Sequence, residues 1–193
     1  MHTWHWISSA ISLVCIILFT ITGITLNHAN YFEASANEII IEETIPQELL
    51  KKLKNNPSST LTELRSWIKT ESKLPTDILQ GDIETTNNEI YIQKPIPGGD
   101  KWLSVDLDKG TLLYSHSDRG WIAWLNDLHK GRNTHGSWNW FIDIFAIATL
   151  VFCITGLILL YIHSKRRPAT WYITAAGLVI PVIIINLFTK LSL

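Results

Sequence analysis

The stretch ISSAISLVCIILFTITGITL, residues 7–26, decides the fold of this chain. It carries no charge, and about 20 apolar residues rising 1.5 Å each match a hydrocarbon core about 30 Å thick. The stretch therefore predicts a helix that crosses a membrane. His5 and His28 flank it, 23 positions apart. On one continuous helix they would lie roughly 34 Å from each other, so they cannot belong to the same site.

Two later segments are also long and apolar. Residues 138–162 contain one charge, Asp143, and residues 171–188 contain Pro181, where neighbouring groups must satisfy the carbonyl that proline frees. Most charged residues lie between these segments and the first one, so the chain combines a membrane anchor with one soluble domain of about 100 residues. The predicted division is a first membrane helix in 1–28, a soluble domain in 29–132, a second helix in 133–163, a loop in 164–170 and a third helix in 171–193.

The loop between the second and third helices sets the predicted orientation. It contains Lys165, Arg166 and Arg167, and short basic loops stay in the cytoplasm. The N-terminus is then cytoplasmic and the soluble domain lies on the outer side. Residues 34–36, Ala-Ser-Ala, resemble a signal-peptidase site, but they follow the apolar run by eight residues and no Lys or Arg precedes it, so we expect no cleavage. The net charge of −1 argues against a nucleic-acid partner.

The pattern F-x-I-T-G-x-x-L occurs twice, at residues 19–26 and 152–159. The two helices that carry it run in opposite directions, as in an inverted repeat. This symmetry pairs opposite helix ends. It predicts one histidine group at the outer face and one at the cytoplasmic face: His28 with His129 and His135, and His163 with His2 and His5.

These histidines allow more than one reading. A single histidine at a helix end more often makes interfacial hydrogen bonds, but histidine is costly in a bilayer, and two groups favour ligand sites. Zinc would need three or four convergent ligands, and no H-E-x-x-H or C-x-x-C spacing is present. Haem needs only axial ligands and apolar walls, and without a C-x-x-C-H motif it would be haem b. The glycine and threonine of each repeat are predicted to serve helix packing, and an equal alternative for Gly23, Gly156 and Gly177 is that they let a flat macrocycle or another helix approach closely.

The soluble domain is predicted to be an α+β module on one sheet. Expected helices cover 46–54 and 61–71, the second with Ser59 or Thr60 and Glu63 as its capping signal. The expected strands are 38–43, 78–84, 89–94, 101–107 and 111–116. Its sequence contains no hydrolase or nucleotide-binding motif.

Several motifs resemble a known family. Residues 102–112, WLSVDLDKGTL, resemble the final hairpin of a PepSY domain. Residues 22–28, TGITLNH, and 126–132, NDLHKGR, with the following Trp138 and Ile142-Asp143, resemble PepSY-associated transmembrane helices. The resemblance covers essentially the whole chain. It implies a membrane α-helical protein with three transmembrane helices and an inserted α+β PepSY-like periplasmic domain, in a bacterial inner membrane.

The resemblance also implies a cofactor. Larger members are inner-membrane reductases of ferric iron or ferric siderophores, with haem b bound by transmembrane histidines. By this resemblance His28 and His129 are the first candidates for axial ligands of an outer haem, and His5 with His163 for an inner one, while His135 is a further cofactor-binding candidate. Because this chain has only three helices, it is expected to hold one or two haems, within one chain or across a homodimer.

The implied activity is that of a haem-dependent ferric reductase supporting iron uptake. Electrons would pass from a separate cytoplasmic donor across the bilayer to ferric iron or a ferric chelate. Lys130 and Arg132, next to His129, are candidates for holding haem propionates or steering an anionic chelate, with helix anchoring at the interface as the alternative. The competing function is a non-enzymatic, membrane-anchored PepSY module that binds or regulates a periplasmic partner protein.

Overall fold

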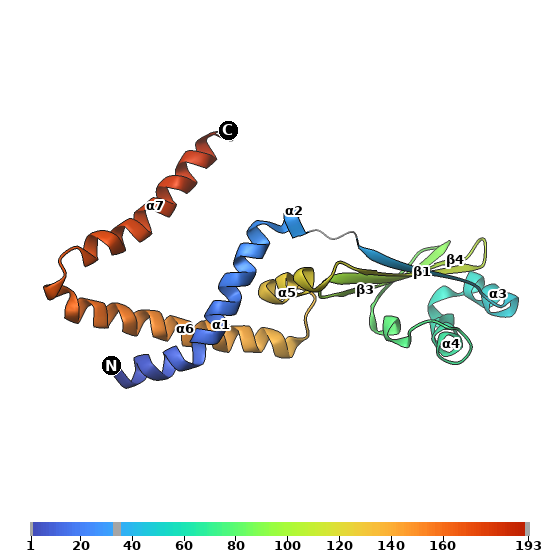
Figure 1. Ribbon diagram of the computed structural model, residues 1–193. Coiled ribbons are helices and arrows are strands. Elements are labelled where there is room, and N and C mark those ends of the chain that lie inside the picture. Colours follow the sequence, from blue (N-terminus) through green and yellow to red (C-terminus); the bar gives the residue numbers. More distant parts are fainter. Residues whose placement is uncertain (1, 33–35, 192–193) are drawn as a thin grey trace. The chain divides into compact units, whose positions relative to one another are not determined.

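The computed structural model describes residues 2–32 and 36–191, so Ala34 and Ser35 of the signal-peptidase motif lie outside the described residues. Three helices are long and apolar enough to cross a membrane (Figure 1): α1 (His2–Asn27), α6 (Gly136–His163) and α7 (Thr170–Leu191). The predicted three membrane helices are therefore confirmed. The chain divides into two compact units, one within residues 1–17 and 141–193 and the other within 18–140.

The second unit contains a five-stranded antiparallel sheet, which confirms the predicted α+β domain. Its strands lie in the order β1 (Asn37–Thr44), β5 (Thr111–Asp118), β4 (Gly99–Asp106), β3 (Glu89–Ile96) and β2 (Asp82–Thr85). Strands β2 to β5 form a meander, and β1 pairs with β5 from Asn37 opposite Asp118 to Thr44 opposite Thr111.

Helices α3 (Gln47–Asn55) and α4 (Pro57–Thr70) pack on one face of this sheet. They do so because both are amphipathic: Leu53 on α3 and Leu64 and Ile68 on α4 are fully buried. The sheet contributes alternate residues of its strands to the same core, as a sheet with one covered face should. These strand residues are Ile90, Ile92, Leu103, Val105, Leu112 and Tyr114.

One strand was predicted to begin too early. Residues 78–84 were expected to be a strand, but Thr76–Gln80 form a 3-10 helix, η1, and β2 starts at Asp82. The physical reason is that Ile78 and Leu79 are both buried. Neighbouring side chains of a strand point to opposite faces, so a sheet with one covered face could bury only one of the two. A Cβ at Gly81 would lie 2.4 Å from the carbonyl oxygen of Gln93, so the turn needs glycine there.

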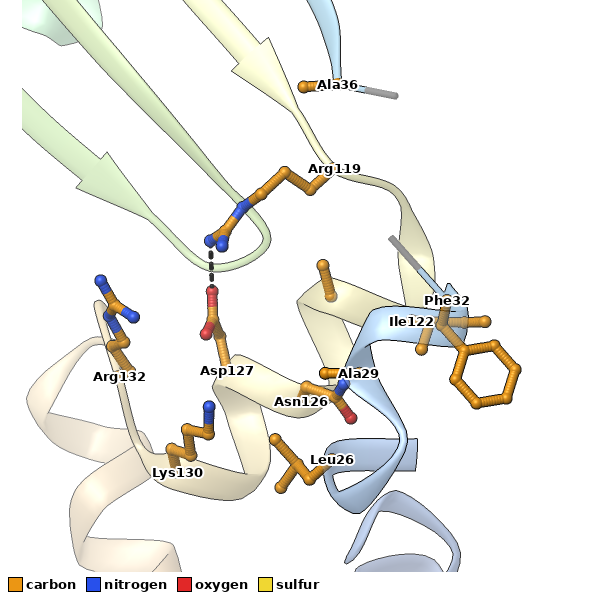
Figure 2. Close-up of a pocket in the computed structure, with 11 residues that line it drawn as sticks. Leu26, Ala29, Phe32, Ala36, Arg119, Ile122, Asn126, Asp127, Lys130 and Arg132 are labelled. Carbon is orange, nitrogen blue, oxygen red and sulfur yellow. Dashed lines mark hydrogen bonds and ion pairs between the residues drawn. The ribbon is translucent and has the colours of Figure 1, made fainter. Parts of the chain in front are cut away.

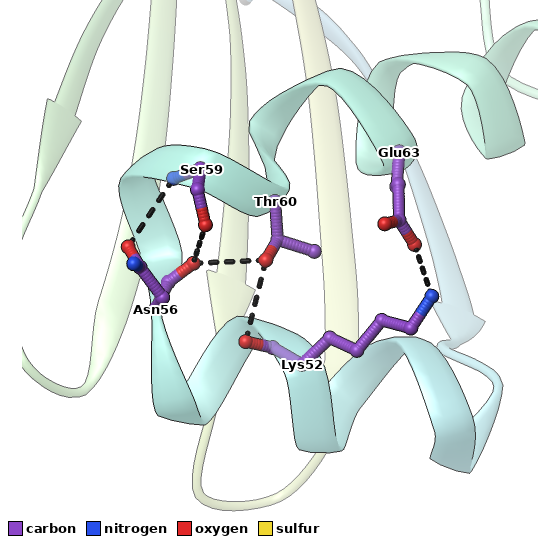
Figure 3. Close-up of polar contacts among 5 residues, drawn as sticks. All are labelled: Lys52, Asn56, Ser59, Thr60 and Glu63. Atoms are coloured by element: carbon purple, nitrogen blue, oxygen red, sulfur yellow. Dashed lines mark hydrogen bonds and ion pairs between the residues drawn. The ribbon is translucent and has the colours of Figure 1, made fainter.

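The predicted capping signal of α4 was wrong by one turn. The helix begins at Pro57, and the side chain of its N-cap Asn56 accepts a hydrogen bond from the Ser59 amide at 3.3 Å. Thr60 Oγ1 instead donates to the carbonyl oxygens of Lys52 and Asn56, and Glu63 pairs with Lys52 at 2.7 Å (Figure 3). These contacts tie α4 to α3.

A helix that was not predicted, α5 (Trp121–Lys130), follows the sheet. Its C-terminus is stopped by Gly131, whose φ of 65° is the left-handed conformation that glycine adopts without strain. The Arg132 amide then donates to the Asp127 carbonyl at 2.9 Å, which closes the last turn. The NDLHKGR motif is therefore a helix end followed by its cap.

The membrane helices place small and polar residues inward. Ser8 and Ser12 of α1 and Thr155 of α6 are buried, and their hydroxyls donate to carbonyls of their own helices. Large apolar side chains are exposed along all three spans. This is the pattern of helices surrounded by lipid, where small residues allow close approach and lipid tails cover the aliphatic ones. In α7 no residue of the described membrane span is buried inside the protein.

Candidate functional site

His129, on α5, packs against the first copy of the repeated motif. Its Nδ1 lies 2.5 Å from Thr22 Oγ1, and its ring lies 4.7 Å, centroid to centroid, from that of Phe19. A Cβ added at Gly23 would lie 3.9 Å from His129 Cε1. Phe19, Thr22 and Gly23 of α1 thus form the surface on which the imidazole rests. We call this arrangement the His129 site.

His5, on α1, packs against the second copy in the same way. Its Nδ1 lies 3.0 Å from Thr155 Oγ1, and its ring is stacked on Phe152 with centroids 4.9 Å apart. A Cβ added at Gly156 would lie 3.4 Å from His5 Cε1, so this glycine lets the imidazole approach the helix. We call this arrangement, made by His5 with Phe152, Thr155 and Gly156 of α6, the His5 site.

The repeated motif therefore has a function that sequence reasoning missed. The pattern F-x-x-T-G places a ring, a hydroxyl and a glycine on one helix surface, and each copy receives a histidine from another helix. Sequence reasoning assigned the threonine to packing, and the glycine either to packing or to the close approach of a macrocycle or another helix. The missed signal was present, because both copies include a Thr-Gly pair at matching places.

The threonine contacts favour one neutral tautomer of each imidazole. Thr22 Oγ1 lies 2.9 Å from the Leu18 carbonyl oxygen and 3.1 Å from that of Phe19, so its single proton points to its own helix. Its oxygen is then left to accept from the Nδ1–H of His129. Thr155 is arranged in the same way: its Oγ1 lies 2.7 Å from the Val151 carbonyl oxygen and 3.0 Å from the Phe152 carbonyl oxygen. In this neutral tautomer Nε2 is the ring nitrogen that carries the lone pair, and neither threonine contacts it.

The surroundings of His129 favour its neutral form. Burial lowers the pKa of His129, and the charge of the adjacent Lys130 lowers it further. A cavity of about 130 Å³ lies beside the ring, with mainly apolar walls. Its lining includes Leu18, Ile21, Leu125, Leu128 and Trp138. A neutral imidazole with a free Nε2 against apolar walls is the form that binds a metal centre.

The other candidate histidines make contacts within their own segments. His28 Nδ1 lies 3.0 Å from the Ile24 oxygen, and His163 Nδ1 lies 2.8 Å from the Leu159 oxygen. His135 Nδ1 lies 3.0 Å from Ser137 Oγ. The structure thus brings His129 and His5 onto partner helices, while His28, His163 and His135 are exposed at the ends of theirs.

Two residues beside His129 hold α5 in place. Thr25 Oγ1 of α1 donates to Asn126 Oδ1 at 2.6 Å. Asp127, only 4% exposed, accepts from the Gly98 amide at 2.8 Å and from Arg119 at 3.0 Å. Asn126 therefore joins α5 to α1, and Asp127 joins it to the sheet. Both belong to the NDLHKGR motif, where sequence reasoning assigned roles to His129, Lys130 and Arg132 alone.

Lys130 and Arg132 line a second cavity, of about 250 Å³, together with Arg119 (Figure 2). The Arg119–Asp127 ion pair spans one side of it. Within residues 2–32 and 36–191, neither Lys130 nor Arg132 forms an ion pair. In the same part of the chain no cluster of three or more His, Cys, Asp or Glu side chains has an arrangement able to hold a metal ion.

These features define a membrane protein with three spanning helices, an inserted α+β sheet domain and a histidine packed on each copy of an internal repeat. The chain belongs to the PepSY_TM-like family: the family model described as "Putative PepSY_TM-like" matches residues 1–190. The resemblance noted in the sequence is thereby confirmed. The chain matches none of the curated proteins and none of the solved structures.

Proposed function

We propose that this protein binds haem b and carries electrons across the membrane to reduce ferric iron, or a ferric chelate, on the outer side. The observation that supports the proposal most strongly is that two histidines are held in the same way, each by one copy of the repeat. An axial haem ligand is a neutral imidazole whose Nε2 is free and whose Nδ1–H is held by a neighbour. His129 and His5 share the geometry that this requires: a threonine hydroxyl contacts Nδ1, and Nε2 is the nitrogen left for a ligand.

The donor set fits haem, with one restriction. Each site offers one axial nitrogen, from His129 or from His5. The cavity beside His129, about 130 Å³, is smaller than the roughly 300 Å³ at which pockets for cofactors begin. The described residues around His129 would therefore hold haem through its iron ligand, and further walls would have to come from outside this cavity. A second axial ligand would come from His28 or His163, in the same chain or in the other copy of a homodimer.

The chain's own residues would orient the imidazole ligands, and burial would favour the neutral form of His129. Thr22 and Thr155 hold the Nδ1–H groups, and burial keeps His129 neutral at pH 7. Phe19 and Phe152 fix the planes of the two rings. Bound haem would supply a one-electron redox couple, whose potential depends on these contacts and on burial. A separate cytoplasmic donor would supply the electrons.

Visible spectroscopy of the purified full-length protein tests this proposal. We expect a Soret band that shifts on reduction and a pyridine haemochrome of the b type. His129→Ala and His5→Ala should each lower haem content at least twofold. His116→Ala, on β5, is the matched control and should keep it.

A folded, colourless protein expressed with haem supplied would reject the proposal and favour the alternative, a membrane-anchored module that binds a periplasmic partner. Full haem content in both variants would exclude His129 and His5 as the ligands.

A further inference from the structure

The cavity of about 250 Å³ lined by Arg119, Lys130 and Arg132 has the chemistry of an amphiphile site. Part of its wall is apolar, from Leu26, Phe32 and Ile122. The cationic side chains line the same hollow, as Figure 2 shows. A soluble anion would gain nothing from the apolar wall, whereas a molecule with an anionic head and an apolar body would contact both.

The charges on the described residues that line this cavity do not balance one another. Among the described residues, three cationic side chains line it, and the one described carboxylate in the lining, Asp127, is paired with Arg119 at 3.0 Å, which leaves a net charge of +2 on the described lining. In addition, Arg119 Nε is buried and has no hydrogen-bond partner in the described structure. A buried donor without a partner costs free energy, so an anion that accepts from it would be stabilised.

The cavity also lies where lipid head groups are expected. Leu26 belongs to the last turn of the membrane helix α1. Helix α5, which supplies Ile122 and Lys130, exposes Trp121 and Trp124, at 70% and 47%. Exposed tryptophan is typical of the boundary between hydrocarbon and water.

We propose that this cavity binds the head group of an anionic phospholipid. Its phosphate oxygens would accept from Lys130, Arg132 and Arg119 Nε, while its glycerol and first acyl carbons would lie against Leu26, Phe32 and Ile122. Basic pockets between membrane helices bind anionic lipid head groups on the cytoplasmic side, and the same charge pairing would act on an anionic lipid of the outer leaflet. The proposal does not depend on haem, because the lipid would be bound whether or not the histidines carry a cofactor.

Native mass spectrometry of the full chain in a neutral detergent tests the proposal, with phosphatidylglycerol as the probe and phosphatidylcholine and inorganic phosphate as comparisons. We expect phosphatidylglycerol adducts at least fivefold more abundant than phosphatidylcholine adducts. The double variant Lys130→Gln/Arg132→Gln should lose this preference. The control Lys54→Gln/Lys69→Gln removes the same charge from exposed positions on α3 and α4 and should keep it.

Each other outcome overturns the proposal. If inorganic phosphate binds as strongly as phosphatidylglycerol, the cavity is a site for soluble anions. If the control variant loses the phosphatidylglycerol preference as fully as the double variant, the attraction is non-specific. If adducts persist in the double variant while haem content falls, the two cations serve a haem instead. Circular dichroism and the single variant Arg132→Gln, expected to lose about half of the preference, separate these results from misfolding.

Discussion

At the scale of single residues, the two threonines of the repeat decide which nitrogen of each histidine is free. The hydroxyls of Thr22 and Thr155 donate to carbonyls of their own helices. Their oxygens are then available to accept from Nδ1–H of His129 and His5. In the proposed haem protein they are positioning residues, which act through His129 and His5. Outer partners of this kind typically change ligand affinity 10- to 100-fold.

Replacing Thr22 by valine tests this role. Valine keeps the shape of threonine but cannot accept a hydrogen bond, so His129 should lose its fixed tautomer. We expect Thr22→Val to lower haem retention about tenfold and to raise the midpoint potential, because an imidazole whose Nδ1–H is not held is a weaker donor. Haem titration and potentiometry measure the two effects.

Two further variants separate positioning from packing. Thr22→Ser restores the hydroxyl and should restore both the retention and the potential. Thr20→Val, at an exposed position of the same helix, should change neither. An unaltered potential in Thr22→Val would show that the threonine serves only packing.

At the scale of elements, the 3-10 helix η1 is attached to the sheet by Asp77. Its carboxylate lies 2.6 Å from Lys101 of β4 and 3.5 Å from Lys94 of β3. Partial burial alone would raise the pKa of Asp77, but the hydrogen bond and charge of Lys101, helped by Lys94, lower it overall. The ionised form is therefore favoured in the folded protein.

This pKa shift predicts a pH dependence. Because the folded pKa lies below the unfolded value, Asp77 stabilises the fold above about pH 4, and this contribution is lost as the pH falls through the folded pKa. Asp77→Asn should cost about 1 kcal/mol at pH 7, since the pair is partly exposed, and less at pH 3. Urea unfolding of the full chain in neutral detergent measures both values. Asp82→Asn, exposed on β2, is the control. If Asp77→Asn lowers the free energy of unfolding equally at pH 7 and at pH 3, the prediction is contradicted.

Periodicity predicted most elements, but the histidine contacts required the structure. The three membrane helices follow from long apolar runs, and β1, β3, β4 and β5 from alternation between turn signals. Helix α5 was missed because Asn126, Asp127 and His129 interrupt its apolar pattern, and their partners are distant in sequence: Thr25, Gly98 and Thr22. Sequence reasoning correctly located a repeat but could not tell that each copy holds a histidine.

At the scale of the whole molecule, the orientation in the membrane decides what each histidine can do. The sheet domain joins α1 to α6, and the loop between α6 and α7 carries Lys165, Arg166 and Arg167. Short basic loops remain in the cytoplasm, so the sheet domain is predicted to be outside. His28, at the end of α1 next to that domain, would then lie on the outer side, and His163, at the end of α6 next to the basic loop, on the inner side.

Cysteine labelling tests this orientation. In a chain without Cys15 and Cys153, Thr62→Cys places a thiol at an exposed position of α4, and Ala169→Cys places one in the basic loop. An impermeant thiol reagent, added to whole cells with a permeabilised outer membrane, should label Thr62→Cys and leave Ala169→Cys unmodified until the cells are lysed. The opposite pattern would place the sheet domain in the cytoplasm. Ferric iron outside the membrane could then not be the electron acceptor at that domain, and the direction proposed for electron transfer would fail with it.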